Sequence, residues 1–180
     1  MDLKETVAMI SGRPVREYAT CNFGLEQVTP ALSVVVPEQG ARELVRRLRA
    51  ALPAGFVCFV GTTEWDGGDE DDSQAEVVVA PGRSQFEILR IARTEAPDLD
   101  LTTDVIAARL QRWDDAHGLD LWHAETDTVE LDLVRRPQDL AAFAAEVYEI
   151  CPDAVEQMAG SLEALAREIG RSGSVQLWWD

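Results

Sequence analysis

The chain of 180 residues is 46% hydrophobic, which suits one folded domain or two small ones that share a core. Its 33 acidic and 16 basic residues give a formal net charge of -17, so the protein should repel phosphate backbones and anionic lipid surfaces. We therefore expect no nucleic-acid partner and no membrane partner. No apolar run approaches the roughly 20 residues that span a bilayer. A charge of this sign attracts cations and basic proteins, although an acidic surface also serves solubility alone.

Cysteine usage and the N-terminal sequence indicate the compartment. The three cysteines, Cys21, Cys58 and Cys151, are odd in number and widely spaced, which argues against a disulfide framework and fits a reducing environment. The opening residues MDLKETVAM contain acids and no continuous apolar stretch, so they are not typical of a secretory signal. We expect a cytoplasmic protein.

The first half of the chain combines helical and strand patterns. A short helix is expected over residues 2–10, with Gly12 as its stop. The segments Leu32 to Val36 and Phe56 to Val60 are typical of buried strands, and residues 39–52 between them have the apolar spacing of a helix. This order predicts a βαβ unit with parallel strands and a right-handed crossover.

Further elements follow in chain order. A strand is expected at Val77 to Val79, followed by a helix that ends before Pro97. Thr102 or Thr103 can cap the next helix, which Gly118 should end. The stretches LDLWHA and TVELDLV, the second containing Val129 to Leu133, predict a hairpin.

The last elements complete the predicted fold. Pro137 suits the first turn of one helix, Pro152 should open a short helix, and Ser161 should cap a helix that runs to Ile169. A strand is expected over Gln176 to Trp179. No linker divides the chain, so we predict a single α+β domain over residues 1–180. It should contain a mixed β-sheet with flanking helices and two strand–helix–strand halves in one compact body.

An acidic loop at residues 64–72 could attract a hard cation such as calcium or magnesium. The calcium-loop template counted from Asp66 requires glycine at position 6 and glutamate at position 12, where Asp71 and Val77 stand. The template fails, and a solvated loop is the better interpretation.

The two histidines offer a second possible metal site. His117 and His123 could join Asp120 or Asp127 as ligands of zinc or iron. Against this, no local zinc spacing occurs, His117 lies where a helix should end, and His123 lies in a strand pattern beside Trp122. We predict no bound metal and no cofactor.

The arginines Arg42, Arg46 and Arg49 form a basic stripe on the predicted helix at residues 39–52. Such a stripe could receive an anionic ligand or an acidic partner. It could equally face water or pair with the chain's own acids, each exposed pair contributing about 0–1 kcal/mol.

The segment Cys151-Pro152-Asp153 places a thiol where a helix should begin, and the helix dipole favours a thiolate there. The neighbouring acids Glu149, Asp153 and Glu156 oppose that thiolate. We therefore favour a structural cysteine, with Asp153 satisfying backbone N–H groups of the first helical turn.

The chain ends in Trp178-Trp179-Asp180. In a strand one indole would face the core and the other would face outward, because side chains alternate. An outward indole can anchor a partner, and a covering helix explains it almost as well. Serine-nucleophile, phosphate-loop and dinucleotide motifs are absent from the sequence.

The sequences YEICPDAVEQ, SLEALAREI and LWWD resemble the bacterial domain of unknown function 4253. The stretches AETDTVELDL and FEILRIARTEAPDLDLTTDVIAARL are also similar to that family, so the family-like region covers about residues 84–180. One departure is EQMAG, where the family usually has Gln-Gly, and it argues against a tight turn directly after Gln157. The resemblance implies no established activity.

Two functions from different classes remain open. The charge and the lack of catalytic motifs favour a non-catalytic acidic module that binds a basic protein, such as an immunity-type inhibitor of a basic toxin. The alternative is a small enzyme or ligand-binding protein with a pocket around Cys151, Asp153, Gln157 and His123. The two differ in whether these four side chains converge.

Overall fold

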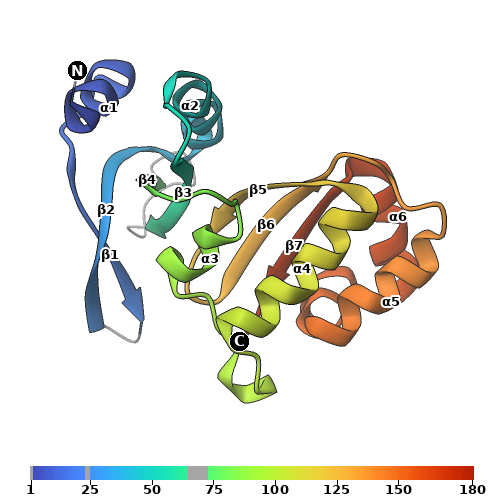
Figure 1. The fold of residues 1–180 in the computed structure, drawn as a ribbon. Coiled ribbons are helices and arrows are strands. Elements are labelled where there is room, and N and C mark those ends of the chain that lie inside the picture. The colour runs from blue at the N-terminus through green and yellow to red at the C-terminus, as the bar shows by residue number, and fades with distance from the viewer. Residues whose placement is uncertain (1, 23–24, 65–72) are drawn as a thin grey trace. The chain divides into compact units, whose positions relative to one another are not determined.

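The computed structural model describes residues 2–22, 25–64 and 73–180 (Figure 1). Most of the predicted acidic loop, residues 65–72, lies outside this part of the chain. The helices and strands are α1 (Leu3–Ser11), β1 (Arg16–Asn22), β2 (Leu25–Pro37), α2 (Glu38–Ala51), β3 (Phe56–Glu64), β4 (Gln74–Pro81), α3 (Glu87–Ala92), η2 (Pro97–Leu99), α4 (Thr103–His117), β5 (Leu119–Ala124), β6 (Thr128–Leu133), α5 (Leu140–Ile150), η3 (Ala154–Ala159), α6 (Leu162–Ser172) and β7 (Ser174–Trp178).

The strands form a mixed sheet in the order β1-β2-β4-β3-β5-β6-β7. The pairs β1–β2, β2–β4, β3–β4 and β6–β7 are antiparallel, whereas β3 and β5 are parallel. The prediction of an α+β fold with a mixed sheet is confirmed. Each predicted strand segment lies in this sheet except Trp179, which follows the last residue of β7.

The strand–helix–strand unit differs from a simple βαβ unit. Strands β2 and β3 are both antiparallel to β4, so they run parallel to each other as predicted, but β4 lies between them. The sequence of β4 explains its central place. From Ala75 to Ala80 every residue is buried, so both faces of this strand are covered. A strand of this kind suits the interior of a sheet rather than its edge.

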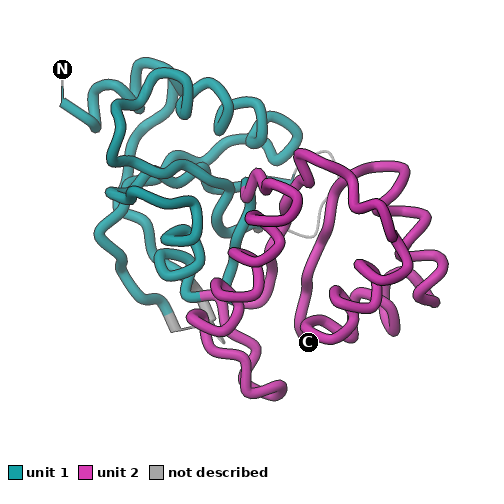
Figure 2. Tube along the Cα trace, turned by 45° about the vertical axis from the view of Figure 1, so that its right-hand side comes forward, with its two compact units in different colours: residues 1–93, 122–126 teal, residues 94–121, 127–180 magenta. Residues whose placement is uncertain are grey.

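The described chain divides into two compact units, shown in teal and magenta in Figure 2. Unit 1 comprises Met1–Arg93 and Trp122–Thr126, and unit 2 comprises Thr94–Leu121 and Asp127–Asp180. The strand β5 contributes residues to both units, because Leu119–Leu121 belong to unit 2 and Trp122–Ala124 belong to unit 1. A single domain over residues 1–180 stays a prediction.

The core of unit 1 forms where α2 packs on the sheet. This helix is amphipathic, and its buried residues are Ala41, Leu44, Val45 and Leu48. They share one apolar cluster with Val7 of α1 and with buried side chains of β2, β3 and β4: Val34, Val36, Cys58, Val60, Ala75, Val77 and Val79. Burying each valine or leucine stabilises the fold by about 1.5–3 kcal/mol before the entropy cost of ordering it.

Unit 2 contains the helices α4, α5 and α6. The Thr102 side chain caps α4 by accepting a hydrogen bond from Val105 N. Gly118 is the C-cap residue that ends this helix, as predicted. Trp113 of α4 packs on Phe143 of α5 with 5.1 Å between ring centroids. Its indole N–H donates to Glu146 at 3.0 Å, so this large buried ring has its polar atom satisfied.

The start of α5 corrects one prediction. Pro137 does not lie in the first turn, because the helix begins at Leu140. Asp139 provides the cap instead, since its carboxylate accepts a hydrogen bond from Ala142 N at 2.9 Å. Ser161 caps α6 as predicted, accepting from Ala164 N at 3.1 Å, and α6 extends beyond Ile169 to Ser172.

Candidate functional site

A short helix follows Pro152 as predicted, but it is a π-helix. Cys151 ends α5 by donating its N–H to Val147 O, and a π-helix then spans Ala154–Ala159. Gly160 closes this turn with a positive φ of 80° and donates its N–H to Val155 O at 2.7 Å, five residues back. A glycine suits this left-handed conformation. Such single π-turns are frequent at functional sites, which draws attention to their surroundings.

Asp153 does not have the capping role predicted for it. Its carboxylate makes no cap hydrogen bond to the described N–H groups of the π-helix. One oxygen accepts from the Gln157 side-chain amide at 2.8 Å, and the other accepts from the backbone N–H of Asp180 at 3.4 Å. Asp153 thus joins the π-helix to the last residue of the chain.

Cys151 is fully buried. Its thiol donates to the backbone carbonyl of Trp178 at 3.1 Å. Burial raises the pKa of the Cys151 thiol above its ordinary value, and the carboxylate of Asp153 acts in the same direction. The thiol is therefore protonated at neutral pH, which does not favour a nucleophilic role.

The terminal tryptophans occupy different environments. Trp178 is the half-buried last residue of β7, whereas Trp179 is only 4% exposed. The Trp179 indole N–H donates to Ile150 O at 2.8 Å, and its backbone N–H donates to Asp127 O at 3.0 Å. Trp179 is thus the inward indole expected from the sequence. The chain end and the segment around Cys151 are bonded to each other at several points.

His123 belongs to unit 1, whereas Cys151, Asp153 and Gln157 belong to unit 2. It pairs with Val60 across β5 and β3, and it is 6% exposed. Its Nε2 lies 3.0 Å from the carboxylate of Glu125, which also accepts from the Thr63 hydroxyl at 2.6 Å. The partners of His123 thus include the Glu125 carboxylate and the neighbouring strand β3.

The residues considered for a metal site have other partners. The Asp127 carboxylate accepts from the Thr128 hydroxyl at 2.9 Å, and the His117 ring lies edge-on to Phe143 with 5.3 Å between centroids. No cluster of three or more histidine, cysteine, aspartate or glutamate residues suited to a metal occurs in the described residues.

A groove of about 490 Å³ lies beside the π-helix in unit 2. The π-helix, α6, β6 and β7 all contribute to it. Its lining combines apolar side chains, two carboxylates, two hydroxyls and one amide: Ala154, Met158, Ala159, Ala164, Leu165, Ile169, Val175, Glu130, Glu168, Ser172, Ser174 and Gln176. The size lies within the usual range of ligand-binding pockets.

The groove is apolar at its base and acidic at its edge. Leu165, Ile169 and Val175 are buried, whereas Met158 is 45% exposed. Glu168 is also exposed and forms an ion pair with Arg171 at 2.7 Å. An exposed methionine beside buried aliphatic side chains offers a surface that adapts to an apolar partner group.

Sequence reasoning missed this groove and instead grouped Cys151, Asp153, Gln157 and His123. None of these four side chains lines it. A local signal did exist, because Met158 and Ala159 form the EQMAG departure from the family pattern. The convergence of Glu130 and Val175 with these residues depends on strand pairing and could not be read from the sequence.

The chain is thus an α+β protein whose C-terminal part contains a groove lined by both apolar and acidic side chains. Residues 76–180 match the model of the domain of unknown function (DUF4253), so the chain belongs to this family. No curated protein and no solved structure matches the chain. Within the described residues, no helix is both long and apolar enough to cross a bilayer.

Proposed function

We propose that the protein is a non-catalytic module that binds a basic protein partner through the groove beside the π-helix. In its most specific form it is an immunity-type inhibitor that covers a basic toxin. The observation that carries this proposal is the pairing of an apolar base with carboxylates at one groove. A lysine or arginine flanked by an apolar side chain has the complementary chemistry.

The exposed acids of unit 2 support a basic partner. Besides Glu168 in the groove lining, the exposed acids of unit 2 include Glu149, Glu156, Glu163 and Asp180. Together with the net charge of -17, they would raise the rate of encounter with a cationic protein and make it sensitive to salt. The apolar groove would then slow dissociation, since desolvated anchors supply most of the binding energy.

The environment of the candidate chemical groups supports a non-catalytic role. The Cys151 thiol is buried and bonded to a backbone carbonyl, and Asp153 is bonded to Gln157 and Asp180. These groups stabilise the chain end, and none of them lines the groove. A binding module requires only the surface, not an activated nucleophile.

The test begins with capture of partners on the immobilised chain from lysate of its native host, at about 50 and about 500 mM salt. A basic protein should be retained at low salt and released at high salt. The purified partner is then titrated against Met158→Ser and Glu168→Gln. Each variant should weaken binding, by about tenfold for the methionine because an apolar anchor is lost.

Matched controls exist elsewhere on the chain. Met9 is 64% exposed on α1, so Met9→Ser controls for the loss of an exposed methionine. Glu43 is paired with Arg46 at i+3, as Glu168 is with Arg171, so Glu43→Gln controls for the loss of a paired carboxylate. Both controls should bind like the wild type. A partner that binds all four variants equally would contradict the groove as the binding surface.

The immunity-type form has its own test. The captured partner should arrest growth when expressed alone and permit growth when this chain is co-expressed with it. The Met158→Ser variant should protect less well than Met9→Ser at equal expression. A partner that binds at the groove but does not arrest growth would overturn the immunity role and leave the binding module.

A further inference from the structure

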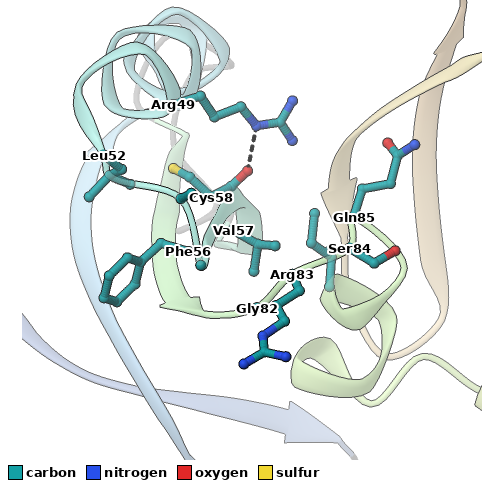
Figure 3. Close-up of a pocket in the computed structure, with 12 residues that line it drawn as sticks. Arg49, Leu52, Phe56, Val57, Cys58, Gly82, Arg83, Ser84 and Gln85 are labelled. Atoms are coloured by element: carbon teal, nitrogen blue, oxygen red, sulfur yellow. Dashed lines mark hydrogen bonds between the residues drawn. The ribbon is translucent and has the colours of Figure 1, made fainter.

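A second pocket, of about 360 Å³, lies in unit 1 at the C-terminal end of α2 (Figure 3). The start of β3 and the turn between β4 and α3 complete it. Its polar lining includes Arg49, Arg83, Ser84 and Gln85, and its apolar lining includes Leu52 and Phe56. None of the described lining residues is acidic. This is unexpected in a chain with 33 acidic and 16 basic residues.

Arg49 and Arg83 reach the pocket from different elements. Arg49 extends from α2, and its Nε donates to Cys58 O at 2.8 Å, which fixes the side chain against β3 (Figure 3). Arg83 is exposed, and its guanidinium makes no hydrogen bond or ion pair with any residue that the structure describes. One guanidinium is thus held in place, and the other can turn toward a ligand.

The turn that carries Arg83 is fixed by backbone contacts. Gly82 donates its N–H to Gly55 O at 2.9 Å. A Cβ at Gly82 would lie 2.8 Å from Val57 Cγ1, so only glycine fits without displacement. The Glu87 carboxylate accepts from the Arg83 backbone N–H at 3.2 Å, so this acid is bonded to the turn itself.

We propose that this pocket binds a small organic anion, in which a phosphate or carboxylate group is attached to an apolar group. The guanidiniums of Arg49 and Arg83 point in different directions in Figure 3, so Arg83 would turn toward an oxyanion held by Arg49, where the paired N–H donors of each match the geometry of the anion. Ser84 and Gln85 offer further hydrogen bonds, and Leu52 and Phe56 contact the apolar part. The volume lies near the lower end of ligand pockets, which fits one ring or a short chain.

This site is independent of the proposed protein-binding groove, since the two lie in different units. It lies only partly within the family-matched residues 76–180, because Arg49, Leu52 and Phe56 precede them and Arg83 lies among them. A negative result for the anion pocket therefore does not contradict the protein-binding groove, and the reverse also holds.

The test is isothermal titration of the full chain with phenyl phosphate, benzoate, inorganic phosphate and phenol. Phenyl phosphate or benzoate should bind saturably with a Kd below about 1 mM. Inorganic phosphate should bind at least tenfold more weakly than phenyl phosphate, and phenol should give no saturable heat. The preference between phenyl phosphate and benzoate identifies the oxyanion. Absence of saturable binding by both would overturn the proposal.

The variant that decides is Arg83→Gln, because the Arg83 side chain is exposed and makes no hydrogen bond or ion pair with the described residues. It should weaken binding at least tenfold, and Arg49→Gln should do the same. The control is Arg46→Gln on the same helix, since Arg46 is paired with Glu43 and does not line the pocket. Equal loss in Arg46→Gln and Arg83→Gln would show general charge attraction and overturn the assigned site.

Discussion

Replacement of Trp179 by phenylalanine should destabilise unit 2 by about 2–4 kcal/mol. The indole is almost fully buried, and its N–H donates to Ile150 O at 2.8 Å. Phenylalanine removes that donor and leaves the carbonyl without its partner, which costs about 1–3 kcal/mol. The smaller ring also leaves a void, which adds about 1 kcal/mol or more. Trp179→Ala should cost about 3–5 kcal/mol, because the whole ring is lost.

The assay is urea unfolding followed by far-ultraviolet circular dichroism, since fluorescence would change with the substitution itself. The control is Trp178→Phe, which alters the same residue type one position earlier, where the side chain is half-buried. That control should cost about 1 kcal/mol or less, the usual range for substitutions away from a core. Equal effects of Trp178→Phe and Trp179→Phe would refute the specific role of the inward indole.

Three further predictions concern buried or bonded groups. Cys151 should react slowly with a thiol probe in the native state, because its thiol is buried and its pKa is raised. Cys151→Ser should retain the bond to Trp178 O and cost about 1 kcal/mol of stability. Rapid native-state labelling would point to a functional thiol. Asp153→Ala should cost about 0.5–1.5 kcal/mol in thermal unfolding because the bonds to Gln157 and Asp180 are lost, and an unchanged melting temperature would contradict their role. Burial raises the pKa of Tyr18 to about 12, so the stability contributed by its neutral form is present below pH 10 and is lost as pH rises from 10 toward 12. Over that interval the loss should reach about 3 kcal/mol in urea unfolding, and Tyr18→Phe should lack this part of the alkaline decline.

Local patterns in the sequence predicted most of the secondary structure. Runs such as Val77 to Val79 became strands because β-branched side chains fit a buried sheet. The strand β1 was missed, since Arg16–Asn22 is largely polar and, between Arg16 and Thr20, only Tyr18 and Thr20 are buried. The sequence predicted a strand at Leu32 to Val36, yet β2 begins earlier, at Leu25, and runs through Pro30. Such a proline lacks one ladder donor without ending the strand.

The candidate site was harder to predict because it depends on pairing across the fold. The bond between the Cys151 thiol and Trp178 O joins residues 27 positions apart in the chain. The groove requires α6 and β7 to lie beside the π-helix, and neither periodicity nor propensity reports such placement. The change from an α-turn to a π-turn after Pro152 is likewise invisible to a hydrophobic pattern, since the two differ only in the hydrogen-bonded partner.

The residues that carry the family resemblance are largely bonded to one another. Cys151 donates to Trp178, the Trp179 indole donates to Ile150, and Asp153 accepts from Asp180. These contacts hold the chain end against the segment after α5, so their substitution should lower stability first. The groove lies beside them but uses other side chains, including Met158 and Glu168. Variants of the bonded residues and variants of the groove residues should therefore differ in whether they change stability or binding. The bonded residues should affect binding only through the folded fraction, whereas the exposed groove residues should affect binding at unchanged stability.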